Sequence, residues 1–248
     1  MLSAAIRSQL RDIQRGRVTG RVVVEGARLV VEAIASGAML EILLWSPRLL
    51  GRPLPAAEIA RVTSHPHARE IADGEMERVQ SGPSHQGVLA VIVLPEFSPG
   101  DCLEGEGWLV VLDGVQDPLN FGAIARSARA FGASGMWYRK GGAGPSSTRA
   151  YRAAAGAFLD LPLAALDDLE GALRTQPRQV WVAAADAPPF GRDWPPPGRG
   201  VLVLGSEGQG TGLDIGKRVS IPMRPGTESL NVAQAAAVLL SRTYPGRL

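Results

Sequence analysis

The chain has 248 residues, of which 45% are hydrophobic and 20% charged, and its formal net charge is +2. This composition is that of a globular protein with room for one large domain or two, and no apolar run approaches the roughly 18 to 20 residues that span a bilayer. Cys102 is the only cysteine, which excludes an intramolecular disulfide and fits a reducing compartment, so we expect a cytoplasmic location. A metal site is not expected, because His65, His67 and His85 lack zinc-ligand spacing and are interpreted as exposed loop residues.

The first part of the chain alternates helical and extended patterns. Helices are predicted over 6–13 and 27–35, and strands over 21–24, 39–45 and 88–94. The start is rich in arginine and resembles a transit peptide, but it runs directly into the first predicted strand, so a folded element is favoured. A proline- and glycine-containing stretch at 95–100 then breaks the pattern. We therefore predict an N-terminal domain over 1–96, a linker over 97–107 and a C-terminal domain over 108–248.

The second part alternates short, continuously apolar strands with helices. The predicted strands are 108–112, 136–138, 180–185, 201–204 and 219–221, and the predicted helices are 121–131, 148–158, 167–174 and 232–242. Strands without polar alternation are buried on both faces, as in a parallel sheet covered by helices. The pattern predicts an α/β fold with a parallel sheet, and the proline-rich segment 188–200 is interpreted as a surface loop.

Arginines are clustered in two regions. They are frequent in the first 28 residues, and the stretch 118–159 contains basic residues but no acid. Guanidinium groups match phosphate and stack on bases, so such clusters favour a polyanionic partner. A genome that favours arginine, encoding a protein with an ordinary surface, would explain the clusters equally well.

Three polar, turn-forming stretches follow predicted strands, where open α/β sheets keep their ligand sites. In the first, Asp117 and Pro118 form a turn and Asn120 is expected to cap the helix 121–131. Arg126 has apolar neighbours in that helix, and a cation buried there would need an anionic partner such as a phosphate or carboxylate. Arg129 is interpreted as a solvated residue on the same helix face.

The second stretch, 205–210, contains three glycines around Glu207. It lacks the lysine of a phosphate loop and the spacing of a dinucleotide fingerprint. A carboxylate here could bind a ribose hydroxyl, an ammonium group or an arginine. A tight turn in which Glu207 caps the backbone, with no binding role, explains the pattern equally well. In the third stretch, Ser229 and Asn231 are cap-type side chains before an alanine-rich helix that is suited to close packing.

Together these stretches resemble the three signature motifs of the SpoU/TrmH family of RNA ribose 2′-O-methyltransferases, in the SPOUT class. The first is Asp117-Pro118-x-Asn120-x-Gly122-x-x-x-Arg126, the second is Leu204-Gly205-Ser206-Glu207-Gly208, and the third is Ile221-Pro222-Met223 followed by Ser229-Leu230-Asn231-Val232. Their order and spacing agree with the family over residues 108–244. The N-terminal half is similar to the L30e-like RNA-binding domain of many members, through residues 24–29 and 84–88.

The resemblance implies a C-terminal deep trefoil knot, a homodimer and S-adenosylmethionine as cofactor, with no metal. The implied cofactor-binding residues are Gly205, Glu207, Ile221, Leu230 and Val232. The implied catalytic residues are Arg126, Asn120, Glu207, Ser229 and Asn231. Because guanidinium is not deprotonated in proteins, we expect Arg126 to clamp the phosphate next to the reacting 2′-hydroxyl rather than to act as a base.

The implied substrate is structured RNA, with contacts from Arg28, Arg129, Arg149 and Arg152. The two-domain layout favours ribosomal over transfer RNA. A tRNA methyltransferase and an rRNA-directed resistance methyltransferase are alternatives within the enzyme class. A catalytically silent RNA-binding module is the alternative from another class, and the presence of all five implied catalytic residues argues against it.

Overall fold

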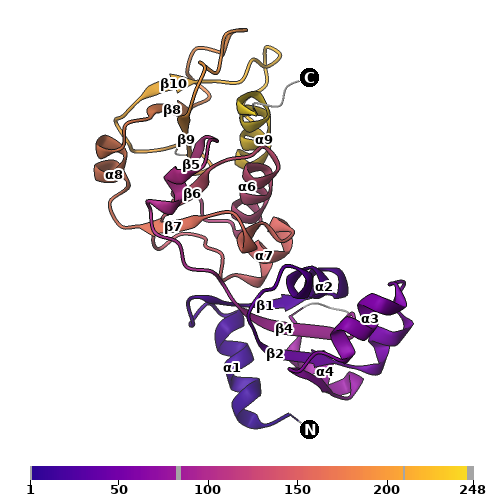
Figure 1. Cartoon of the computed structure of the whole chain (residues 1–248). Coiled ribbons are helices and arrows are strands. Elements are labelled where there is room, and N and C mark those ends of the chain that lie inside the picture. Colours follow the sequence, from indigo (N-terminus) through magenta and orange to yellow (C-terminus); the bar gives the residue numbers. More distant parts are fainter. Residues whose placement is uncertain (1, 82–84, 209, 245–248) are drawn as a thin grey trace. The chain divides into compact units, whose positions relative to one another are not determined.

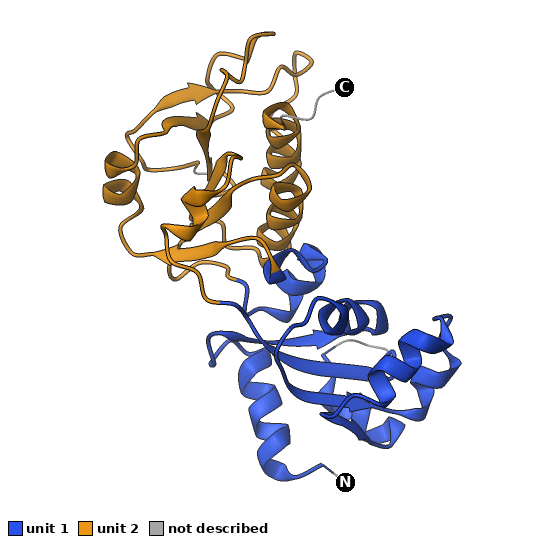
Figure 2. Ribbon diagram, in the orientation of Figure 1, with its two compact units in different colours: residues 1–95, 145–159 blue, residues 96–144, 160–248 orange. Residues whose placement is uncertain are grey.

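The computed structural model describes residues 2–81, 85–208 and 210–244. The chain forms two compact units, coloured separately in Figure 2. Unit 1 comprises residues 1–95 and 145–159, and unit 2 comprises residues 96–144 and 160–248. A segment from the second half of the sequence is therefore part of unit 1.

Unit 1 contains a mixed four-stranded sheet in the order β1-β4-β2-β3. Its strands are β1 (Arg21–Glu25), β2 (Leu40–Trp45), β3 (Ala68–Glu70) and β4 (Val88–Val93). β4 pairs antiparallel with both β1 and β2, whereas β3 pairs parallel with β2. The predicted strands 21–24, 39–45 and 88–94 are thus present, while the three-residue β3 was not predicted.

Helices cover both faces of this sheet (Figure 1). They are α1 (Ala4–Gln14), α2 (Ala27–Ala35), α3 (Ala56–Thr63), α4 (Asp73–Val79) and α7 (Thr148–Ala154), with 3-10 turns η1 (Pro47–Gly51) and η2 (Ala157–Leu159). On one face, Leu10 of α1 and Met76 of α4 pack with Val23 of β1. Because side chains alternate along a strand, Val22 and Val24 point to the opposite face, where α2 contacts β1 and β4.

Unit 2 contains a six-stranded sheet in the order β10-β8-β9-β5-β6-β7, in which every neighbouring pair is parallel. Its strands are β5 (Leu109–Asp113), β6 (Gly135–Arg139), β7 (Leu163–Leu166), β8 (Gln179–Ala183), β9 (Gly200–Gly205) and β10 (Lys217–Val219). The predicted fold class, α/β with a parallel sheet, is confirmed. The trefoil knot stays a prediction.

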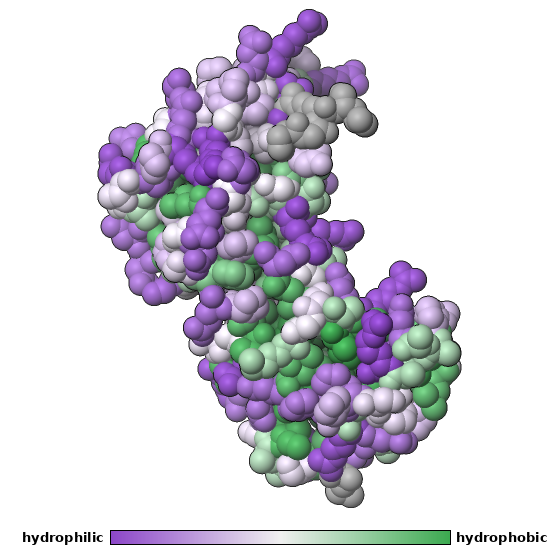
Figure 3. All heavy atoms as spheres, in the orientation of Figure 1, coloured by the Kyte–Doolittle hydropathy of each residue, from purple (hydrophilic) through white to green (hydrophobic). Residues whose placement is uncertain are grey.

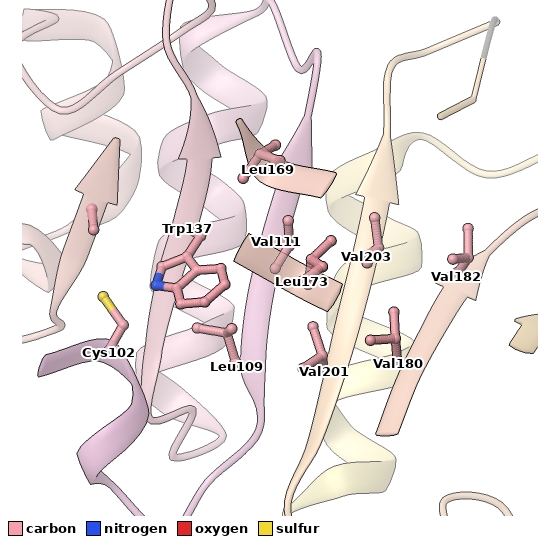
Figure 4. Packing of buried hydrophobic residues seen from close by; sticks show 11 residues of the cluster. Cys102, Leu109, Val111, Trp137, Leu169, Leu173, Val180, Val182, Val201 and Val203 are labelled. Carbon is pink, nitrogen blue, oxygen red and sulfur yellow. The ribbon is translucent and has the colours of Figure 1, made fainter. Parts of the chain in front are cut away.

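Two layers of helices enclose this sheet: α5 (Asp101–Glu104) and α8 (Leu169–Thr175) on one face, and α6 (Pro118–Ala130) and α9 (Val232–Thr243) on the other. Figure 4 shows the first layer, where Leu169 and Leu173 of α8 pack over side chains of β5, β8 and β9. Burial on both faces explains the continuously apolar strand sequences. Among the described residues, no helix is both long and apolar enough to cross a membrane.

Two helix boundaries differ from the prediction by three residues or more. Asp117, not Asn120, is the N-cap of α6, and its Oδ1 accepts a hydrogen bond from the backbone N–H of Leu119 at 3.0 Å. The proline that follows is favourable at the first helical position, so the helix starts three residues earlier. The helix predicted over 148–158 ends at Ala154, because Ala155 and Gly156 have positive φ values of 45° and 79°.

The interpretation of His85 as an exposed loop residue is wrong. The residue is 2% exposed, and its Nε2 lies 3.2 Å from Nη1 of Arg48 and 3.6 Å from a carboxylate oxygen of Glu77. These two charged neighbours give the ring polar partners inside unit 1. His67 is exposed and His65 half-buried, and no group of metal-binding side chains is present in the part of the chain that the structure describes.

The proline-rich segment 188–200 is more than a surface loop, because it is anchored by aromatic packing. Trp194 is 6% exposed and meets the rings of Trp108 and Trp181 edge-on, with centroids 5.9 and 6.1 Å away. Phe190 stacks on Trp194 at 5.2 Å, and Arg242 of α9 donates a hydrogen bond to the Trp194 carbonyl at 3.1 Å. A segment rich in proline can therefore still contribute to the core.

Candidate active site

The second and third sequence stretches line a hollow of about 930 Å³ in unit 2. It lies beside the carboxyl ends of β8, β9 and β10, the edge where ligands of parallel sheets bind. All five residues predicted to bind the cofactor line it: Gly205, Glu207, Ile221, Leu230 and Val232. Three of the predicted catalytic residues line it: Ser229, Asn231 and Glu207, which belongs to both predicted sets.

The glycine-rich stretch begins with a close backbone approach at Gly205. A Cβ atom built on Gly205 would overlap the backbone of Gly210 and Thr211. The chain can fold back here because glycine has no side chain, and the fold is closed by two backbone hydrogen bonds between Ser206 and Gly210, at 2.8 and 3.0 Å. Gly205 is thus required by the loop itself, apart from any ligand that the hollow holds.

Glu207 joins the first and third sequence stretches. Its Oε1 accepts hydrogen bonds from Nδ2 of Asn120 and from Nδ2 of Asn231, the latter at 2.9 Å. Asn231 also donates to Oδ1 of Asn120 at 3.2 Å, and as N-cap of α9 it accepts from the N–H of Ala233 at 2.9 Å. The other carboxylate oxygen of Glu207 has no hydrogen-bond partner among the described residues, so it remains available to a hydroxyl donor.

The partners of Glu207 were not predicted from the sequence. The expected partners were a hydroxyl, an ammonium group or an arginine, whereas the structure provides two side-chain amides. Asn120 reaches Glu207 because it lies in the first turn of α6, facing inward, with 9% of its surface exposed.

Arg126 lies further along α6, and its side chain is exposed. The expectation that it is a cation within apolar surroundings is wrong, because the apolar neighbours Ile124, Ala125 and Ala128 lie on the buried side of the helix. Within the described residues, Arg126 has no hydrogen-bond or ion-pair partner. It is therefore a solvated cation free to meet an external anion.

The stretch 118–159 contains no acidic residue, but acids from other parts of the chain lie next to it in the structure. Four of its six cations are paired with acids from elsewhere in the chain: Arg129 with Asp160, Arg139 with Asp113, Lys140 with Asp167, and Arg152 with Glu25. Figure 3 shows hydrophilic residues spread over the visible face among hydrophobic ones. The sequence pattern therefore overstated the free positive charge of this region.

Asp113, Arg139 and Thr211 belong to the surroundings of the hollow but were not predicted. Thr211 lines it and donates its hydroxyl hydrogen to Oδ2 of Asp113, while Nε of Arg139 donates to Oδ1 at 2.6 Å. The available signal was Asp113 itself, a carboxylate at the end of a strand that is otherwise apolar and buried. A buried acid requires donors, although the sequence does not say which residues supply them.

A model of the SpoU rRNA Methylase family matches residues 107–241. The 23S rRNA (guanosine-2′-O-)-methyltransferase RlmB of Ralstonia nicotianae is 37% identical over 204 residues, which are 75% of this chain and 78% of that protein. A solved structure of a TrmH-family protein from Porphyromonas gingivalis has a TM-score of 0.76 at 31% identity, and 98% of each chain is covered. The SpoU methyltransferase AviRb of Streptomyces viridochromogenes has the same fold, with a TM-score of 0.81 at 22% identity over 98% of this chain and 97% of that one.

The matched residues include all three sequence motifs and every residue that lines the hollow. The family predicted from the motifs is therefore confirmed, and the chain belongs to the SpoU rRNA Methylase family.

Proposed function

We propose that this protein transfers the methyl group of S-adenosylmethionine to a ribose 2′-hydroxyl of ribosomal RNA. Family membership makes it an RNA methyltransferase, and the predicted enzyme class is confirmed. The observation that supports the detailed reaction best is the placement of Glu207 between Asn120 and Asn231 at the edge of a ligand-sized hollow. This arrangement joins the three motifs into one site.

The hollow fits the adenosyl cofactor in size and chemistry. Its volume of about 930 Å³ is at the upper end of the range for small-molecule sites. Its walls combine apolar side chains, such as Ile221 and Leu230, with backbone groups of the glycine-rich loop. The proposed cofactor-binding residues are Gly205, Glu207, Ile221, Leu230 and Val232. When bound, the cofactor supplies an electrophilic methyl group, and the protein has to align the ribose oxygen with it.

Each proposed catalytic residue has a role that its surroundings support. Asn120 and Asn231 hold Glu207 through one oxygen, which leaves the other oxygen to accept a hydrogen bond from a ribose hydroxyl. Arg126 is exposed and binds the phosphate beside the reacting ribose through its guanidinium fork. Ser229 lines the hollow and contributes a hydroxyl to the same wall.

The proposed RNA contacts include residues of both units. In unit 1, Arg28 and Arg152 line a second hollow of about 330 Å³ together with Arg52. Arg28 is exposed and has no polar partner among the described residues, so it can bind phosphate without breaking an ion pair. Arg129 and Arg149 complete the proposed set. We propose that residues 1–96, the greater part of unit 1, act as the L30e-like RNA-binding domain, with a linker over 97–107 and a catalytic domain over 108–248.

We also propose the homodimer and the trefoil knot that the family resemblance implies, and the cytoplasmic location expected from the single cysteine. The apolar side chains Leu119 of α6 and Val238 of α9 are 43% and 37% exposed, and these two helices pack on each other. A second copy placed on this pair of helices would bury both side chains.

The substrate is tested by mapping 2′-O-methyl sites in ribosomal and transfer RNA from cells with and without the protein. The proposal predicts the loss of one site from ribosomal RNA. Loss of a site from transfer RNA would support the tRNA alternative, and a site gained only under antibiotic selection would support a resistance enzyme. Intact methylation in both pools would contradict the proposal.

A further inference from the structure

A buried carboxylate connects the wall of the cofactor hollow to a residue outside it. Asp113, at the end of β5, is 7% exposed. One of its oxygens accepts from Nε of Arg139 at 2.6 Å, and the other accepts from the hydroxyl of Thr211. Among the described residues, Thr211 is in the lining of the hollow, whereas Asp113 and Arg139 are not.

Ordering the loop that contains Thr211 costs much backbone conformational entropy. Four of the eight residues from 205 to 212 are glycines, and glycine loses more backbone freedom on ordering than any other residue. Gly205 is register-paired with Asp113 across β5 and β9, so the loop leaves the sheet directly beside this carboxylate. Contacts that hold the loop therefore reduce the entropy that ligand binding would otherwise lose.

Thr211 makes two bonds that hold the loop in place. Its hydroxyl donates to Asp113, and the same oxygen accepts from the backbone N–H of Leu213 at 3.1 Å. Leu213 lines the hollow and also packs against the buried cluster of the sheet. The hydroxyl thus joins the loop to β5 on one side and orients the next wall residue on the other.

We propose that Asp113 is a positioning residue for cofactor binding: Arg139 orients it, and it holds Thr211 so that the described loop residues 205–208 and 210–213 keep their binding shape. The inference rests on the proposed function, because it assigns S-adenosylmethionine to this hollow. Arg139 affects the cofactor only through Asp113 and Thr211. A role limited to stability would lower the melting temperature without changing the affinity for the cofactor.

The test is isothermal titration of the full-length protein with S-adenosylmethionine, for wild type, Thr211→Val and Arg139→Gln. Both variants should bind about tenfold more weakly, the change expected for one lost charge-assisted hydrogen bond, with turnover at saturating cofactor within about twofold of wild type. Thr211→Ser should restore the affinity, since it keeps the hydroxyl. The combined variant should lose less than the product of the two single losses, because both act on Asp113.

Matched controls are Thr175→Val, whose hydroxyl donates to the Gly171 and Ala172 carbonyls of its own helix, and Lys140→Gln, which breaks an exposed pair with Asp167. Both should bind like wild type. Wild-type affinity in folded Thr211→Val and Arg139→Gln would overturn the inference; if Thr211→Val does not fold, the half-exposed Arg139 provides the test by itself. Wild-type protein without affinity for S-adenosylmethionine would overturn the proposed function, and this inference with it.

Discussion

Asn231 donates a hydrogen bond from its Nδ2 to Oδ1 of Asn120 at 3.2 Å, although 111 residues separate them in the chain. Both amides also donate to the same oxygen of Glu207. Each asparagine comes from the start of a helix, α6 or α9, and these two helices pack side by side. The packing of two helix starts therefore determines the position of one carboxylate.

Asn120→Ala is expected to lower turnover about tenfold to a hundredfold, because it removes one donor from a carboxylate that must be held in place. Asn231→Ala removes the other donor and the cap of α9 at once, whereas Asn231→Ser keeps a capping oxygen. We therefore expect Asn231→Ser to retain the stability of wild type while losing turnover. Steady-state kinetics and thermal denaturation measure the two effects separately, and full activity in Asn231→Ser would argue against the network.

Arg126→Ala is expected to lower turnover by about a hundredfold or more while leaving cofactor affinity unchanged, because Arg126 is exposed and lies outside the lining of the hollow. Arg126→Lys should recover little of the loss, since an ammonium group lacks the planar fork that matches phosphate. Arg174→Ala is the control, an exposed arginine on α8 paired with Glu170. Calorimetry that finds cofactor affinity lost in parallel with activity would contradict this division of roles.

Gly205→Ala is expected to destabilise the protein by about 1–3 kcal/mol, because the new methyl group overlaps the backbone of Gly210 and Thr211. The loop has to move, so cofactor binding should be lost as well. Gly212→Ala is the matched control from the same loop, since a Cβ there meets no atom within 4 Å. Equal melting temperatures for the two variants would show that the close approach at Gly205 is absent.

Cys102 is expected to be unreactive in the native protein. Burial raises the pKa of its thiol from 9.0 to about 11, so the reactive thiolate is scarce at pH 8. The unfolded chain releases this proton at lower pH than the folded one, so this residue lowers the stability as pH rises from about 9 to about 11. A thiol reagent at pH 8 should label the denatured but not the native protein, and rapid labelling of both would refute the assignment.

The parts of the fold that the sequence predicted well are those in which local pattern and burial agree. Strands such as β5 and β9 are apolar throughout because helices cover both of their faces, and their positions were predicted within one or two residues. The edge strand β7 was missed, since it is only four residues long and most of its residues are half-buried. Helices α3 and α4 were missed as well, because exposed polar residues interrupt their apolar pattern.

The candidate site was predicted in its members but not in its contacts. Motif order indicated which loops meet, because the carboxyl ends of parallel strands share one edge. The bond between Thr211 and Asp113 depends on how the glycine loop folds back, over 98 residues of sequence separation. Likewise, the ion pairs of Arg129 and Arg152 depend on tertiary placement, so a charge count along the sequence could not reveal them.

In the proposed reaction, the hollow and the Asn120–Glu207–Asn231 network direct a methyl group to a ribose oxygen. The most direct measurement incubates the purified protein with methyl-labelled S-adenosylmethionine and ribosomal RNA lacking the modification, followed by alkaline hydrolysis. A 2′-O-methyl group protects the adjacent phosphodiester bond, so we predict label in alkali-stable dinucleotides. Label confined to alkali-sensitive nucleotides with a methylated base, or no label at all, would contradict the account.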